Sequence, residues 1–157
     1  FPKAKVKVRT DVPELDVMDE KSLKVIKEKK LSLYEILTIS ASYDLISREL
    51  VRGFEKTFGY ASLLMDFATK RSINDAIAHA YLRFLSEEED TFVKMKFGTE
   101  KSKYVLDRAK EIVNSGYVRK EIEEFNEVLI REGINPGSTA DIIAAALFVD
   151  ILGGLRV

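Results

Sequence analysis

Apolar residues recur at spacings of three and four along most of this 157-residue chain. That spacing places side chains on one face of an α-helix, because the helix turns once every 3.6 residues. The clearest stretch carries apolar or aromatic residues at Ile36, Ile39, Tyr43, Ile46, Leu50 and Phe54. The chain has only 8 glycines and 3 prolines, so few positions interrupt such segments. Since no two segments pair convincingly as strands, we predict an all-α fold.

Polar caps and glycines mark where the expected helices begin and end. Ser32 and Glu35 form a capping box, in which each side chain binds the backbone N–H of the other residue. We expect a break near Gly59 and helix ends at Gly116 and Gly133. The expected helices cover residues 22–30, 33 to about 58, 60–69, 73–86, 100–113, 118–132 and 138–152. The sequence therefore predicts a single domain of about six or seven helices.

The last expected helix contains the longest apolar run, from Ile142 to Val149. A helix that is apolar on all sides has to be enclosed by others, so we expect it to be central and buried. The run is far shorter than the ~20 residues that a membrane-spanning helix needs. We therefore predict no membrane segment.

Residues 1–19 differ in pattern from the rest of the chain. Lys3, Lys5, Lys7 and Arg9 alternate with small apolar residues, and an acidic stretch follows them. A period of two suits an extended segment. We predict an extended arm and loop, which is either solvated or in contact with a polyphosphate or an upstream part of the protein.

The charge and residue counts exclude several classes of protein. The 25 basic and 26 acidic residues give a net charge of −1, which argues against general binding to nucleic acid. Without cysteine there is no disulfide, thiolate zinc site or cysteine nucleophile. A single histidine leaves carboxylates as the expected ligands of any metal.

The chain begins with Phe1 rather than methionine and shows no signal-peptide pattern. We expect a truncated, processed or partial cytoplasmic polypeptide. Abundant lysine and glutamate, with no glutamine or cysteine, are typical of thermophile proteins.

The turn before the last helix offers a candidate anion site. Asn135 and Gly137 allow the backbone to turn, and Ser138 with Asp141 is expected to cap the helix. A helix N-terminus attracts phosphate, and an acid beside it would need Mg²⁺ between the two anions. An ordinary serine cap explains the same pattern.

A second candidate lies between Asp90 and Gly98. Lys94 and Lys96 alternate with apolar residues, so an extended segment would direct both cations to one side. Two converging lysines beside an acid suit a polyphosphate and its metal. An amphipathic connector with a solvated charged face is the alternative.

Asp44 and Arg48 stand one helical turn apart, with the acid first. That order favours a surface ion pair. Because apolar positions flank both residues, the pair could instead line a cleft. His79 has no partner motif and is expected to be structural, and the common serine-nucleophile and Gly-rich phosphate motifs are absent.

Three segments match, in order and rough spacing, the motifs of one known family. They are YDLISRELVRGFEKTF, DTFVKMKFGTEKSKYVLDRAKEI and INPGSTADIIAAALFVDIL. The first is similar to R-D-x-I-A-R-x-Y-x-x-G-F, and the second to D-[ST]-x-[IV]-x-x-K-x-G followed by a helix. The third is similar to an NPG- or SPG-type turn followed by [ST]-A-D-L and an apolar helix. Together they resemble the C-terminal half of the triphosphoribosyl-dephospho-CoA synthase family, in its archaeal and divergent branch.

This resemblance implies a transferase that moves a triphosphoribosyl group from ATP to the ribose 2′-hydroxyl of dephospho-CoA or a related acceptor and releases adenine. It implies ATP and the acceptor as partners and Mg²⁺ as cofactor. The resemblance gives candidate roles to residues by their positions in the three motifs, and the alternation around Lys94 adds that residue. Asp44 and Asp90 are expected to be catalytic, and Asp90 and Asp141 to bind metal. The expected substrate and phosphate contacts are Arg48, Lys94, Lys96, Gly98, Asn135, Gly137 and Ser138.

Two other functions stay open on the sequence. The chain could be a non-catalytic helical module that binds a nucleotide, or a domain that only assembles. In the second case we expect a homo-oligomer or association with an upstream fragment of the same protein.

Overall fold

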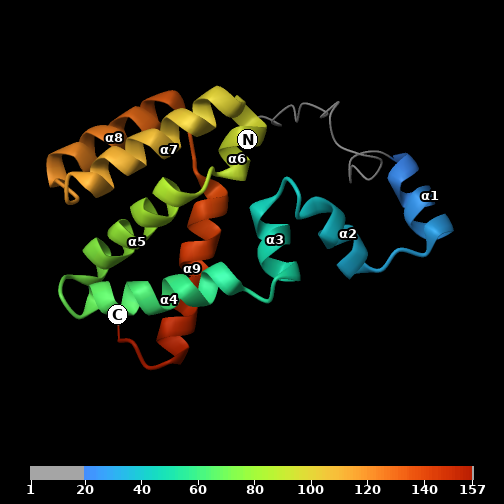
Figure 1. Cartoon of the computed structure of the whole chain (residues 1–157), viewed down its shortest axis with the longest axis horizontal. Helices are drawn as coiled ribbons and strands as arrows, with labels where there is room; N and C mark the ends of the chain where they lie inside the picture. The colour runs from blue at the N-terminus through green and yellow to red at the C-terminus, as the bar shows by residue number, and fades with distance from the viewer. Residues whose placement is uncertain (1–19, 157) are drawn as a thin grey trace, which may run out of the picture.

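The computed structural model describes residues 20–156, which fold entirely into helices and connecting turns (Figure 1). The predicted extended arm of residues 1–19 lies outside this range. The helices are α1 (Glu20–Lys29), α2 (Leu33–Ser40), α3 (Leu45–Val51), α4 (Glu55–Ala68), α5 (Ile73–Glu87), α6 (Thr91–Phe97), α7 (Thr99–Asn114), α8 (Arg119–Glu132) and α9 (Gly137–Leu152). The all-α prediction is confirmed, but the described residues form nine helices rather than six or seven.

The expected long helix from residue 33 is three separate helices. Its start is as predicted, because the Ser32 N–H donates to Glu35 Oε2 at 2.8 Å and the Glu35 N–H donates to Ser32 Oγ at 3.3 Å. The break expected near Gly59 is wrong, since α4 runs through that residue. The chain turns instead at Gly53 and Phe54, whose φ angles of 69° and 64° are left-handed. Two successive left-handed residues cannot continue a right-handed helix.

The segment after Asp90 is helical rather than extended. Asp90 caps α6, because its Oδ1 accepts a hydrogen bond from the Val93 N–H at 2.9 Å. Residues two apart on a helix point to different sides. The prediction that Lys94 and Lys96 point the same way is therefore wrong, and alternation over so few residues did not distinguish the two geometries.

Two further helix starts differ from the expected ones. The helix expected over residues 100–113 already begins at Thr99, with Gly98 as its N-cap, and the N-cap of α9 is Pro136; neither has a side-chain cap. Ser138 lies inside α9, so the predicted cap by Ser138 with Asp141 is wrong. The helix ends at Gly116 and Gly133 are confirmed, with φ angles of 84° and 65°.

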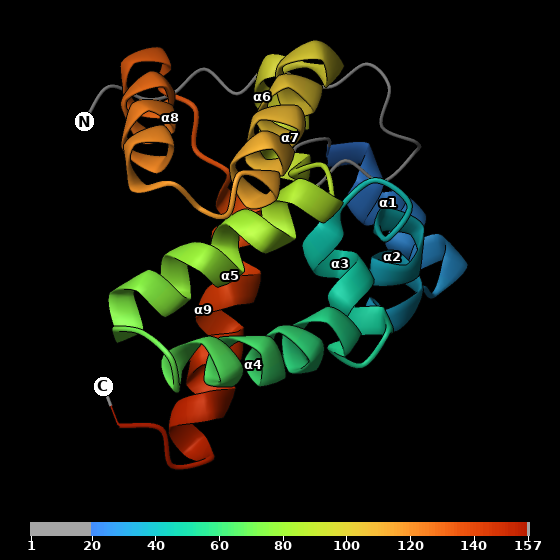
Figure 2. The same ribbon diagram turned by 60° about the vertical axis from the view of Figure 1, so that its left-hand side comes forward.

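The core consists of two apolar clusters that meet at α5. The first joins α3, α4, α5 and α9 through residues such as Leu45, Leu64, Phe84 and Ile142. The second joins α5 to α6, α7 and α8 through residues such as Leu85, Val93, Val105, Ile112 and Phe125. Figures 1 and 2 show α9 crossing α4 and α5, while α7 lies beside α6 and α8. Contributions to both clusters make α5 the link between them.

The prediction of a central, buried last helix holds for only half of α9. Ile142, Ile143 and Ala146 are buried between α4 and α5. Phe148 and Leu152, by contrast, are 60% and 72% exposed. A helix that is apolar all round is thus covered here on one side and at one end. No helix among residues 20–156 has both the length and the apolarity that crossing a bilayer would require.

Candidate functional site

The N-terminal ends of α3, α6 and α9 meet at a buried junction. Asp90, which is 1% exposed, accepts hydrogen bonds at Oδ2 from the Thr139 N–H (2.8 Å) and the Thr139 hydroxyl (2.9 Å). Thr91 Oγ1 accepts from the Leu45 N–H at 3.1 Å and shares a hydrogen bond with Ser138 Oγ at 3.0 Å. Asp90 and Thr91 therefore tie α6 to both α9 and α3. We call this group, with Leu45, Ser138 and Thr139, the junction.

The start of α9, predicted as an anion site, already faces an anion. The Asp90 carboxylate binds there, where helix N–H groups and the helix dipole favour negative charge. Gly137 faces the Phe92 ring, which a Cβ at this position would meet at an ordinary contact distance of 3.4 Å. The Tyr81 hydroxyl donates to the Pro136 carbonyl at 3.3 Å. Burial, with the nearby charge of Asp90, raises the pKa of Tyr81, which keeps this donor protonated.

Glu87, the last residue of α5, accepts hydrogen bonds from one residue of α4 and one of its own helix. Its carboxylate accepts a hydrogen bond from the Tyr60 hydroxyl at 2.7 Å and one from Arg83 Nε at 2.5 Å. Burial tends to raise the pKa of Glu87, but these two donors outweigh it and hold the pKa below its usual value. Burial and the same hydrogen bond raise the pKa of Tyr60. Glu87 is therefore an ionised acceptor between α4 and α5.

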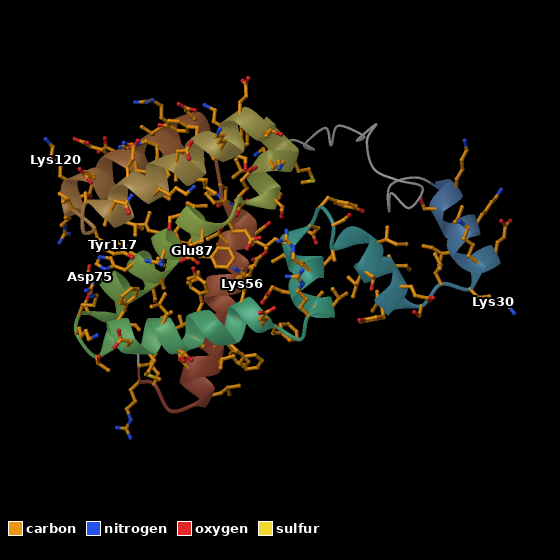
Figure 3. The ribbon with its side chains drawn as sticks, in the orientation of Figure 1. Lys30, Lys56, Asp75, Glu87, Tyr117 and Lys120 are labelled. Atoms are coloured by element: carbon orange, nitrogen blue, oxygen red, sulfur yellow. The ribbon has the colours of Figure 1, made fainter. Side chains whose placement is uncertain are left out.

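The next two glutamates bind cations from three helices and a hydroxyl group from a fourth. Glu88 pairs with Arg48 of α3 and, at 3.3 Å from Oε2 to Nζ, with Lys56 of α4. Glu89 pairs with Lys94 of α6, with 3.1 Å between Oε2 and Nζ, and accepts from Ser102 Oγ of α7 at 3.1 Å. Burial tends to raise the pKa of Glu89, but Lys94 and Ser102 lower it overall. Figure 3 shows Glu87 and Lys56 close together near the centre of the molecule.

These groups surround a pocket of about 540 Å³. It is lined by Ser42, Tyr43, Arg48, Glu87, Glu88, Glu89, Thr91, Lys94, Met95, Leu106 and Lys110. Three cations and three carboxylates face it, together with an aromatic ring and two apolar side chains. Lys110 makes no ion pair with any of the residues that the structure describes. The pocket can thus offer positive charge, negative charge and an apolar surface to one ligand.

Two of the sequence-predicted site residues, Arg48 and Lys94, line this pocket. The predicted Asp44–Arg48 pair is wrong, because Asp44 caps α3 by accepting from the Ser47 N–H at 2.8 Å. Arg48 reaches across to Glu88 instead. Of the two proposed catalytic acids, Asp90 lies in the junction and Asp44 at the start of α3, one residue before Leu45 of the junction.

The remaining predicted residues lie outside the pocket lining. Gly137 and Ser138 belong to the start of α9, and Ser138 is buried in the junction. Three others are exposed on the surface, and Lys96 lies over the Phe97 ring at 5.1 Å. The exposed positions are Lys96, Asn135 and Asp141, and Gly98 is the exposed N-cap of α7.

Sequence reasoning missed the three glutamates and Lys110. In the sequence, residues 87–89 follow the helix expected over residues 73–86 and have no predicted site role. A helix C-terminus carries partial negative charge, so three successive carboxylates there are unfavourable unless cations meet them. That conflict was the available signal, and Arg48, Lys56 and Lys94 are the cations that resolve it.

The donor set does not form a metal site by itself. Within residues 20–156 no three histidine, cysteine or carboxylate side chains are grouped to hold a metal ion. Asp90 is buried and hydrogen-bonded, whereas Asp141 is exposed. A metal held by one or two carboxylates together with a bound phosphate remains compatible with the pocket.

His79 occupies a partly buried position away from the pocket, as expected of a structural residue. Its ring stacks on Tyr117 with 4.1 Å between centroids and meets the Phe67 ring edge-on at 5.9 Å. Arg71 contacts the ring at Nδ1. These contacts tie the end of α4 to the turn between α7 and α8.

Comparison with known proteins identifies the relatives of this chain. The family described as ATP:dephospho-CoA triphosphoribosyl transferase (CitG) matches residues 1–156. The chain belongs to this family. A curated member, the "Probable 2-(5''-triphosphoribosyl)-3'-dephosphocoenzyme-A synthase" of Malonomonas rubra, is 26% identical over 133 residues. The resemblance inferred from the three sequence motifs is thereby confirmed.

A solved structure shows the same fold. It is the crystal structure of a "putative triphosphoribosyl-dephospho-coA synthase" from Archaeoglobus fulgidus, with a TM-score of 0.77 and 30% identity over 90% of this chain. The match covers 61% of that protein, and the match to the Malonomonas rubra relative covers 80% of this chain but 42% of the relative. This chain therefore corresponds to only part of each relative.

Proposed function

We propose that this chain carries part of the active site of a triphosphoribosyl transferase and that the pocket holds ATP. In the reaction, the 2′-hydroxyl oxygen of dephospho-CoA or a related acceptor bonds to C1′ of the ATP ribose. The bond from C1′ to adenine breaks, and adenine leaves with the hydroxyl proton. The carrying observation is that Arg48 and Lys94, both predicted as phosphate contacts, line one pocket in a chain that belongs to the family.

The cations of the pocket suit the triphosphate. Arg48 offers a planar fork of N–H donors that can bind two phosphate oxygens at once. Lys94 and Lys110 add mobile point charges on another wall of the pocket. Tyr43, Met95 and Leu106 supply an apolar surface for the adenine ring.

The carboxylates suit the ribose and the metal. Positive charge develops at C1′ as adenine leaves, and a fixed carboxylate stabilises such charge. Among the described residues, Glu87, Glu88 and Glu89 are the acids that line the pocket. We propose that they serve there, while Asp44 and Asp90 hold the helices that shape it. Mg²⁺ would enter with the triphosphate, held by Glu88 or Glu89, and would neutralise phosphate charge.

The test is release of adenine, measured by chromatography after the chain is mixed with ATP, Mg²⁺ and dephospho-CoA. We expect adenine from the wild-type chain and none above background from Arg48→Met. Arg52→Met, at an exposed arginine one turn later that forms the C-cap of α3, is the matched control and should behave as wild type. Absence of adenine with dephospho-CoA and with other ribose acceptors would contradict a catalytic role.

The non-catalytic module is the second candidate, favoured by the fraction of its relatives that the chain spans, 42% and 61%. A calorimetric titration with ATP, run beside the adenine assay, separates the two. ATP binding that depends on Arg48 without any adenine release would indicate a nucleotide-binding part of a longer enzyme. The expected association with a second copy or with an upstream fragment stays a prediction.

A further inference from the structure

Carboxylates of the protein already form ion pairs with cations at the pocket. Arg48 and Lys56 both bind Glu88, and Lys94 binds Glu89. Glu88 and Glu89 themselves line the pocket. Of the three cations that line the pocket, a ligand with negative charge therefore meets two, Arg48 and Lys94, that carboxylates of the protein already neutralise.

These ion pairs are accessible to water. The side chains of Arg48 and Glu88 are 26% and 21% exposed, and those of Lys94 and Glu89 are 44% and 34% exposed. Such partly exposed pairs contribute only about 0–1 kcal/mol, because water solvates the separated charges well. A triphosphate brings several charges and many acceptor oxygens, and the guanidinium binds them in bidentate form. Exchange of a carboxylate for phosphate is thus energetically easy here.

Asp90 is a carboxylate that a phosphate ligand cannot displace from its hydrogen-bond donors. It is 1% exposed and accepts from two backbone N–H groups and one hydroxyl. Glu88, in contrast, has only Arg48 and Lys56 as side-chain partners within the described residues. Glu89 retains Ser102 if Lys94 moves away. The two glutamates differ from Asp90 in burial and in the kind of donor that holds them.

We propose that Glu88 and Glu89 occupy the phosphate positions of the empty pocket and that a polyphosphate binds by displacing them from Arg48, Lys56 and Lys94. This inference rests on the proposed function, because it concerns the same pocket. It assigns to Glu88 two successive states, bound to cations when the pocket is empty and released into the pocket when phosphate binds. No covalent change is involved.

The proposal predicts that one substitution in the pocket strengthens triphosphate binding rather than weakening it. Glu88→Gln keeps the shape of the side chain but removes the charge that competes for Arg48 and Lys56. We expect the affinity for inorganic triphosphate to rise about two- to fivefold, the equivalent of losing one such ion pair. Glu89→Gln should raise it less, since only Lys94 is freed. A glutamate that simply maintained the pocket would give lower affinity on substitution.

The experiment is calorimetric titration of the chain with inorganic triphosphate, without metal and at constant ionic strength. The matched control is Glu123→Gln, which removes the same charge from an exposed pair with Arg119 on α8. A thermal melt of each variant confirms that it is folded, and Glu89→Gln provides the test independently if Glu88→Gln does not fold.

Tighter binding by the pocket variants, with Glu123→Gln at wild-type affinity, supports the proposal. Unchanged or weaker binding by Glu88→Gln and Glu89→Gln overturns it, and adenine release then still tests the proposed function separately. An equal gain in Glu123→Gln also overturns it, because net charge alone would explain the effect. Absence of triphosphate binding in all variants overturns both this inference and the assignment of the pocket.

Discussion

The junction and the pocket each place a carboxylate where positive charge collects, but they hold it in different ways. In the junction, Asp90 is enclosed and bound by backbone N–H groups that cannot move away. In the pocket, two residues earlier, Glu88 is partly exposed and bound by side chains that can. The donor and its mobility, more than the charge, therefore decide whether an anion position is structural or available to a ligand.

Removing the junction carboxylate should have the largest effect. Asp90→Ala leaves the Val93 and Thr139 N–H groups and the Thr139 hydroxyl buried without a partner. Unpaired buried polar groups are costly, so we expect a loss of about 3 kcal/mol in the free energy of unfolding. Urea denaturation measures it, with the exposed Asp141→Ala as control at about 0.5 kcal/mol or less. Equal losses in the two variants would remove the distinction between the junction and the surface.

Arg48→Met tests the pocket side of the comparison. We expect at least about a tenfold loss of triphosphate affinity, because a charged hydrogen-bond donor is removed. Stability should fall by less than about 1 kcal/mol, since the pair with Glu88 is partly exposed. Titration and urea denaturation of the same sample give both values, and Arg52→Met should change neither. A large stability loss with unchanged affinity would make Arg48 a structural residue like Asp90.

Asp150 is a third case beside Asp90 and Glu88, because it is a buried carboxylate without adequate hydrogen-bond donors. It is 6% exposed, and its Oδ2 has no hydrogen-bond partner. Burial raises its pKa, so the ionised form destabilises the fold above that pKa and protonation relieves the cost as the pH falls through it. We expect Asp150→Asn to stabilise the chain by about 1 kcal/mol at neutral pH. Thermal melts should show the gain shrinking in acid, and a gain independent of pH would point to another cause.

Glu89→Gln should have the smallest effect, a slight change in how the free energy of unfolding depends on pH. The pKa of Glu89 is lowered in the folded state, so its contribution is present above the unfolded pKa and is lost as the pH falls through the folded one. Because the side chain is about one-third exposed, we expect only a few tenths of a kcal/mol. Urea denaturation of Glu89→Gln between pH 7 and acid should show a slightly flatter dependence than wild type. A steeper one would contradict the assigned direction of the pKa shift.

What the sequence predicted correctly depends on contacts between residues close together in the chain. The Ser32–Glu35 capping box spans three residues, and Gly116 and Gly133 act on the helices they follow. The contacts that build the site are distant in sequence. Arg48 binds Glu88 across 40 residues, and Thr139 binds Asp90 across 49.

For the candidate site, the sequence supplied residue types but not their partners. Arg48 was expected to bind Asp44, its neighbour on a helix, because the start of α3 at Leu45 was not recognised. Lys94 was found for the wrong reason, since the alternation that suggested it belongs to a helix. The Glu87–Glu89 run was visible in the sequence, but its importance depends on cations that only the fold brings to it.

The position of α5 between the two apolar clusters has a consequence for how the pocket can vary. Arg48 stands on a helix of the first cluster, whereas Lys94, Leu106 and Lys110 stand on helices of the second. The end of α5 supplies the glutamates between them. Each wall can therefore diverge during evolution through changes in its own core while the other wall stays intact. A change in one core would thus alter the cations on one side of the pocket and leave those on the other side in place.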